Sequence, residues 1–303
     1  MPSSSHASSS DPLHPQDAPP GAPSNGACDD AASLGWRASL ELGVAHANGR
    51  SRIEHLRHTG PLRVQKAFHP EPNGTCHIYV LHPPGGIAGG DELRIGVDVA
   101  ARARALVTSP AAQKLYRSAT HPSVQRIALR VGSGHLEWLP QETIAFAGTQ
   151  ASIRLHVELE DDAAFIGWDI LCLGRPACDE RFDRGWIDQT LEIQRGGRPV
   201  WSERLHIQPG SPLLTAPWGL RGCTTLATLV CSPANPACVE ALRDTVRVAA
   251  DEHFAATAPR GLIVCRFLGA HAWRAREALA SAWNVLRPAV IGSQAVPPRI
   301  WST

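Results

Sequence analysis

The stretch RASLEL, residues 37–42, places an apolar side chain at every second position. A period of two is typical of a β-strand, because successive side chains point to opposite faces. Short runs of similar character follow at residues 76–82, 92–99, 123–131, 151–159 and 163–174. Residues 189–207 indicate a hairpin in which two runs are joined through Gly196 and Gly197. Because no helical pattern alternates with these runs, the fold is predicted to be mainly β rather than a doubly wound parallel sheet.

The C-terminal third of the chain differs in character. Asn235 followed by Pro236 is a favourable helix start, and apolar residues then recur at spacings of three and four. Residues 261–269 form a short apolar run that is typical of a buried strand. A second helix is expected after His271, ending at Pro288. The C-terminal third is therefore predicted to contain two helices and a strand.

The first 35 residues are unlike the rest of the chain. Residues 1–35 are rich in Ser, Pro, Ala and Asp and have almost no large apolar side chains. They bury too little surface to offset the entropy of ordering, so we expect a disordered tail. Residues 36–303 are predicted to be a single domain, mostly β over residues 36–230 and a strand–helix module over residues 231–303. No secretory signal precedes them, which predicts a cytoplasmic protein.

Composition narrows the class of protein. Apolar residues make up 43% of the 303 residues and charged residues 19%, which fits a globular chain with a sizeable core. A formal net charge of +1 gives no strong field for nucleic acid or for an anionic membrane. No apolar run of about 18 residues is present, so no spanning helix is expected.

The eight cysteines are scattered and form no C-x-x-C pair. They are Cys28, Cys76, Cys172, Cys178, Cys223, Cys231, Cys238 and Cys265. Zinc-type spacing is missing as well. In a chain of this length without a secretory signal, free and buried thiols are the favoured interpretation.

The densest glycine cluster is PPGGIAGGDEL, residues 83–93. Gly85 and Gly90 have the spacing of a phosphate-binding loop, but Asp91 and Glu92 stand where that loop needs Lys and a hydroxyl. Two carboxylates would repel a phosphate, so we predict a tight turn with positive φ angles instead. Asp91 is kept as a carboxylate held in a rigid loop.

Two further segments carry acids. LEWLPQETI, residues 136–144, brings Glu137 and Glu142 close in sequence. They could serve as general acid and base or as oxygen ligands for a divalent metal, but solvated surface acids are the plainer interpretation. In LGRPACDERF, residues 173–182, Glu180 lies among arginines, as part of a surface ion-pair network or as an acid lining a polar passage.

Several histidine and nucleophile signatures are missing. His55 with His58, and His77 with His82, would point to opposite faces of a strand, so neither pair is a metal clamp. The sequence contains no H-E-x-x-H and no G-x-S-x-G.

Taken together, eight segments resemble one family, the urease accessory protein UreD, also called UreH. They are GPLRVQKAFHPE (60–71), CHIYVLHPPGGIAGGDELRIGV (76–97), LVTSPAAQKLYRS (106–118), LEWLPQETIAF (136–146), WDILCLGRPACDERF (168–182), VCRFLG (264–269), AWNVLRP (282–288) and PPRIWST (297–303). Their order is that of the family, and the resemblance covers nearly all of residues 36–303.

The resemblance implies a fold and a role. UreD proteins are mostly β, with a helix-like stack of strands and two helices. They bind UreF, which recruits the GTPase UreG, and the assembly docks on apo-urease. Nickel then passes from UreG to the urease active site, where a carbamylated lysine bridges two nickel ions. UreD itself hydrolyses nothing and is thought to hold an internal channel, so transient nickel and no tightly bound cofactor are expected.

The resemblance also suggests site residues. Those that match acidic positions of the family's motifs are Asp91, Glu137, Glu142 and Glu180, taken here as channel or docking acids. Lys114, Tyr116, Asp169 and Arg175 are read as structural or interface residues. In two places the sequence departs from the family: Asp179 replaces the usual Gly, which puts the role of Glu180 in question, and Ser109 replaces the commoner Thr.

Two other functions remain open at this level. One is a β-helix hydrolase that uses Glu137 and Glu142, which requires a cleft with two carboxylates about 5 to 9.5 Å apart. The other is a nickel-storage protein, whose acids would converge on one closed site. For the nickel-delivery scaffold, apolar and aromatic residues are expected on the surface, where partners would cover them in a higher-order complex.

Overall fold

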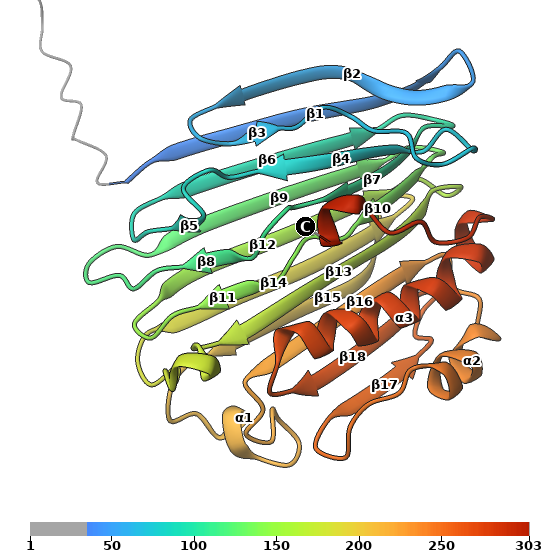
Figure 1. Cartoon of the computed structure of the whole chain (residues 1–303). Coiled ribbons are helices and arrows are strands. Elements are labelled where there is room, and N and C mark those ends of the chain that lie inside the picture. The colour runs from blue at the N-terminus through green and yellow to red at the C-terminus, as the bar shows by residue number, and fades with distance from the viewer. Residues whose placement is uncertain (1–34, 303) are drawn as a thin grey trace, which may run out of the picture. The chain divides into compact units, whose positions relative to one another are not determined.

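A computed structural model of the chain describes residues 35–302. All but the last residue of the predicted disordered tail lies outside this range. The described residues are mainly β with three α-helices, so the predicted fold class is confirmed at that level (Figure 1). Within residues 35–302, no helix has both the length and the apolar character that a membrane crossing requires.

The strands form two sheets, the first of which has seven strands. Its order is β15 (Arg198–Ile207), β14 (Trp186–Arg195), β12 (Gln150–Leu159), β9 (Ser123–Val131), β6 (Glu92–Val99), β1 (Arg37–Ala47) and β2 (Arg50–Thr59). The five inner strands run parallel to one another. The outermost strands β2 and β15 are antiparallel hairpin partners of β1 and β14. The hairpin predicted through Gly196 and Gly197 is thus confirmed.

The second sheet has eleven strands. Its main path is β17 (His253–Thr257), β18 (Ile263–Gly269), β16 (Thr225–Ser232), β13 (Ala164–Leu173), β10 (His135–Trp138), β7 (Arg104–Thr108), β4 (Cys76–Leu81) and β3 (Arg63–Val64). Three short strands pair beside that path: β5 (Gly86–Ile87), β8 (Gln113–Leu115) and β11 (Thr143–Ala145). From β4 to β14 the chain alternates between the sheets, apart from these short strands. The helix-like stack implied by the resemblance stays a prediction.

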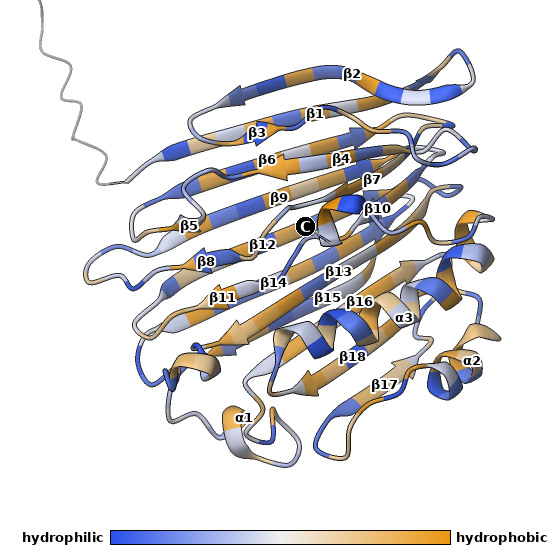
Figure 2. Cartoon of the chain, in the orientation of Figure 1, coloured by the Kyte–Doolittle hydropathy of each residue, from blue (hydrophilic) through white to orange (hydrophobic). Residues whose placement is uncertain are grey.

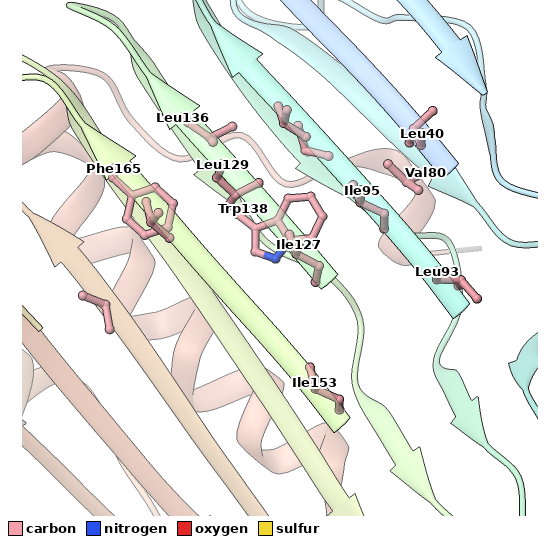
Figure 3. Packing of buried hydrophobic residues seen from close by; sticks show 14 of the residues in the cluster. Leu40, Val80, Leu93, Ile95, Ile127, Leu129, Leu136, Trp138, Ile153 and Phe165 are labelled. Atoms are coloured by element: carbon pink, nitrogen blue, oxygen red, sulfur yellow. The ribbon is translucent and has the colours of Figure 1, made fainter. Parts of the chain in front are cut away.

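The main hydrophobic core lies between the two sheets. Figure 3 shows side chains that meet there, such as Ile127 and Ile153 from the first sheet and Trp138 and Phe165 from the second. In β9 every second residue is buried, as the period of two requires. Each large apolar side chain buried in this way contributes about 1.5 to 3 kcal/mol.

A second core lies on the outer face of the eleven-stranded sheet. There α3 (Ala272–Ile291) packs across β13, β16 and β18, and α2 (Cys238–Thr245) packs against α3 (Figure 1). Both faces of β13 are therefore covered, which explains its nearly continuous apolar sequence. The third helix, α1 (Pro212–Thr215), is a single turn.

The C-terminal helices differ from the prediction at their ends. The helix expected to stop at Pro288 continues to Ile291, so that boundary was wrong. Because Pro288 lies in the last turn, it interrupts little of the hydrogen-bond ladder, and Gly292 ends the helix in a left-handed conformation with φ +74°. The first C-terminal helix was predicted to start at Asn235 and Pro236. The side chain of Asn235 accepts a hydrogen bond from the N–H of Ala237, and α2 begins at Cys238.

Candidate functional site

A cavity of about 430 Å³ lies between the two sheets. Most of its wall is apolar, from inward-facing residues such as Ile127, Trp138 and Leu226. Polar side chains interrupt this wall, among them His82, Gln113, Gln125, Asp169, Gln189, Glu203, Thr228 and Arg266. An apolar cavity with a few convergent polar groups is the usual form of a small-ligand site.

Asp169 is a carboxylate in this wall with few donors. It lies on β13, and among residues 35–302 the side chain of Gln189 alone donates to it, over 2.7 Å. Burial raises the pKa of Asp169, and the nearby charge of Glu203 adds to the rise. Its accessible surface faces the cavity, and the weakly compensated carboxylate is available to a cation there.

Glu203 is held differently. Both of its carboxylate oxygens accept hydrogen bonds from the guanidinium of Arg266, each over 2.7 Å. Arg266 also donates to the hydroxyl of Thr228 over 2.8 Å. Since Glu203 lies on β15 and Arg266 on β18, this bidentate pair joins the two sheets beside the cavity.

The glycine-rich turn meets the cavity at His82. Gly85 and Gly90 have φ angles of +71° and +89°, so the predicted tight turn with positive φ is confirmed. The two carboxylate oxygens of Asp91 accept hydrogen bonds from the backbone N–H groups of Trp36 and Ala88, each over 2.8 Å. Burial lowers the pKa of His82, whereas the charge of Asp91 opposes that shift. Asp91 therefore fixes the turn that presents His82.

A buried ion-pair cluster lies on the outer face of the eleven-stranded sheet, the face that α3 covers. Its members are Glu71, His77, Glu137, Trp283 and Arg287. The Nε of Arg287 donates to Glu137 over 2.9 and 3.0 Å, and its terminal nitrogen donates to both oxygens of Glu71 over 2.7 and 2.8 Å. Trp283 donates to Glu137 over 2.6 Å, and the ring of His77 lies 2.7 Å from Glu71. The cluster ties α3 to β4 and β10.

Charge and burial compete within this cluster. Burial is the largest influence on Glu137 and raises its pKa, with the charge of Glu71 adding to the rise. Burial also acts on Glu71, but the hydrogen bonds from His77 and Arg287 outweigh it and lower the pKa of Glu71. Glu137 is only 1% exposed, so the interpretation of a solvated surface acid was wrong. The reason is that α3 covers the face of β10 that points away from the main core.

Glu142 lies in the loop after β10. Its Oε2 is buried and accepts no hydrogen bond within the described residues, although Arg276 lies 3.8 Å away. Arg276 instead donates to the side chain of Gln141 over 2.5 Å. The charge of Glu142 adds to the burial that raises the pKa of the Cys172 thiol.

Glu180 closes a short surface turn. Its carboxylate accepts hydrogen bonds from Arg175 over 2.5 Å and from the backbone N–H of Ala147 over 3.0 Å, and the bond from Arg175 holds its pKa low. Arg175 also lies over the ring of Phe146, 4.2 Å from its centroid. Asp179 has φ +56°, so this position, where the resemblance implies Gly, adopts the left-handed conformation.

The four sequence-predicted acids thus lie in different places. None of them lines the cavity. Among residues 35–302, no three His, Cys, Asp or Glu side chains gather in a way that could hold a metal ion. The carboxylates that do line the cavity are Asp169 and Glu203, which sequence reasoning missed as site residues. Asp169 could have been identified from the sequence, because it is the lone charged residue in the apolar run 163–174. Glu203 could not, since polar residues are common along its strand.

The thiols lie away from the cavity wall. The cysteines within the described residues are free, which confirms that prediction, and five of the seven are buried. Burial raises the pKa of the Cys76 thiol to about 11 and that of Cys265 to about 12. Cys28 lies outside the described residues. The side chains that face the cavity offer oxygen and nitrogen donors.

These features define a class: a two-sheet β protein with a mostly apolar inter-sheet cavity that carries a few polar side chains, and a C-terminal helix locked to one sheet by buried charges. Residues 37–302 match the family described as UreD urease accessory protein. The Brucella anthropi protein named urease accessory protein UreD 2 is 44% identical over 273 residues, which span 89% of this chain and 100% of that protein. For urease accessory protein UreD of Dechloromonas aromatica, the identity is 46% over 277 residues, spanning 89% and 96%. The chain belongs to the UreD family of urease accessory proteins.

Proposed function

We propose that this chain is a non-catalytic scaffold for inserting nickel into apo-urease, acting in the cytoplasm in a higher-order complex with UreF and UreG. The observation that carries this proposal is the inter-sheet cavity, whose carboxylates are Asp169 and Glu203 and whose wall also presents His82. Nickel accepts oxygen and nitrogen ligands of this kind. The ion would be cargo that passes through, without becoming a resident cofactor.

The donor set suits passage better than storage. A conducting site must bind an ion strongly enough to admit it and weakly enough to release it. Asp169 has its single amide partner and Glu203 is shared with Arg266, so neither forms a closed cage. Thiolates would select copper or zinc over nickel, and the buried cysteines lie outside the cavity.

Exposed aromatic residues supply candidate docking sites for the proposed partners. Trp218 is 74% exposed and lines the cavity, and Trp273, at the start of α3, is 57% exposed. Large aromatic side chains are enriched among the residues that dominate binding energy at interfaces. We assign the partly exposed acids Asp91, Glu142 and Glu180 to docking or to the outer ends of the nickel route, and Glu137 to holding α3 in place.

Co-purification tests the scaffold directly. The wild-type chain is expected to retain both UreF and apo-urease, and Trp218→Ala is expected to weaken the retention of one of them at least tenfold. If well-folded wild-type chain retains neither UreF nor apo-urease, the proposal is contradicted. In cells deleted for this chain, complementation with Glu142→Ala and with Glu180→Ala is expected to lower urease activation, and full activation by both would remove these two acids from the site.

A further inference from the structure

The edge strand β2 is an exposed and positively charged edge of the seven-stranded sheet. Figure 1 shows it at the margin of the sheet, with β1 as its partner. Within the described residues, the backbone of Arg52–His58 makes no hydrogen bond to any segment other than β1. Seven residues of free edge span about 23 Å, enough to pair with another extended segment.

The outer face of β2 is basic. The pairing register places Arg50, Arg52, His55 and Arg57 on the face that carries Glu41 and Ala45 of β1, and the single acid of the strand, Glu54, lies at the bulge. Neither Arg52 nor Arg57 has an ion-pair partner in the part of the chain that the structure describes. Figure 2 shows hydrophilic residues along much of this strand. Charge complementarity therefore calls for acidic side chains beside it.

The inner face of β2 carries two apolar side chains, Ile53 and Leu56, between Ser51 and His58. Leu56 pairs with Leu42, which is completely buried, yet Leu56 itself is 39% exposed. Ile53 pairs with the buried Val44 on the same face. The apolar stripe of the core thus runs to the edge of the sheet, where Ile53 packs against the core and Leu56 stays exposed.

Charged residues on an edge strand can also serve only to prevent self-pairing. That function alone would not explain Leu56, because an exposed apolar side chain on the inner face favours association. The basic outer face and the two apolar side chains of the inner face together specify an alternating pattern in the added strand.

We propose that β2 is a docking site for an extended segment of a partner protein in which acidic and apolar residues alternate. The segment adds a strand to the seven-stranded sheet, with its carboxylates beside Arg52 and Arg57 and its apolar side chains beside Ile53 and Leu56. This inference goes beyond nickel delivery and does not depend on the cavity.

The test uses the full chain and a fluorescein-labelled octapeptide of alternating Asp and Val. Binding is followed by anisotropy, and hydrogen exchange reports the backbone amides of Arg52–His58. The peptide is expected to slow exchange in this segment, and a peptide of the same composition with four Asp followed by four Val is expected to bind at least tenfold more weakly. Arg52→Glu with Arg57→Glu is expected to raise the Kd at least tenfold.

A matched control pair carries the same charge change elsewhere. Arg102→Glu with Arg198→Glu alters two exposed arginines, one of them on the opposite edge strand β15, and is expected to leave the Kd within twofold. The proposal is overturned if the alternating peptide at millimolar concentration leaves the exchange of Arg52–His58 unchanged. Equal binding of the two peptides, or equal weakening by the two variant pairs, would show charge attraction alone and would also overturn it.

Discussion

Two neighbouring strands of the eleven-stranded sheet send carboxylates to opposite faces. Glu137 on β10 points toward α3 and joins the buried ion-pair cluster, whereas Asp169 on β13 points into the inter-sheet cavity. Glu137 is buried and Asp169 is half-buried, and burial raises the pKa of each. They differ in their partners: Glu137 accepts from a guanidinium and an indole, but Asp169 accepts from one amide.

This difference separates a carboxylate that holds the fold from one that is available to a ligand. In the buried ion-pair cluster, the oxygens of Glu71 and Glu137 are occupied by donors from α3 and the sheet. Breaking such a cluster leaves an uncompensated buried charge. In the cavity, Asp169 retains accepting capacity, because among the described residues Gln189 alone donates to it.

The largest expected effect follows from removing the shared cation of the buried ion-pair cluster. Arg287→Met leaves Glu71 and Glu137 buried without their guanidinium partner, and is expected to lower the free energy of unfolding by about 3 to 5 kcal/mol. Arg266→Met breaks the partly exposed pair with Glu203, and is expected to cost about 1 kcal/mol or less. Urea unfolding of both variants measures the contrast, and equal losses would contradict the distinction between the two regions.

A smaller effect of opposite sign is expected in the cavity. Asp169→Asn removes a carboxylate whose ionised form is disfavoured by burial, and is expected to stabilise the protein at pH 7 by about 1 kcal/mol while weakening its function. Urea unfolding of the wild type and the variant at pH 4 and pH 7 measures this change. A less stable variant at pH 7 would show that Asp169 serves the fold.

The pH dependence fixes the sign of this prediction. Because the folded state raises the pKa of Asp169, the folded protein keeps a proton that the unfolded chain releases. The free energy of unfolding therefore falls as pH rises from about 3.9, the ordinary Asp pKa, through the raised value. The gap between Asp169→Asn and the wild type should accordingly be wider at pH 7 than at pH 4, and an unchanged gap would contradict the account.

The smallest effect concerns a position that belongs to neither region. Asp179→Gly places glycine at a left-handed position, which removes strain but adds freedom to the unfolded chain. These contributions nearly cancel, so the free energy of unfolding should change by no more than about 0.5 kcal/mol. Asp179→Val, a β-branched residue unsuited to positive φ, should cost more than about 1 kcal/mol in the same assay.

The sequence predicted the mainly β class because a period of two is a local signal, visible in runs such as residues 37–42. It did not predict that Glu137 is buried, because the cover comes from α3, almost 150 residues further along the chain. The same limit applies to Asp169 and Glu203, which pairing of distant strands brings to one cavity. Local residue types identified candidate acids, but only tertiary packing decides which face each of them occupies.

Nickel incorporation into urease tests the role of the cavity most directly. In cells lacking this chain, Asp169→Asn with Glu203→Gln should yield urease with less than about one tenth of the wild-type nickel content, while still co-purifying with apo-urease. A control with the same charge change, Glu240→Gln with Asp244→Asn on α2, should restore wild-type nickel. Wild-type nickel content with the cavity variant would contradict the claim that these two carboxylates line the route of the ion.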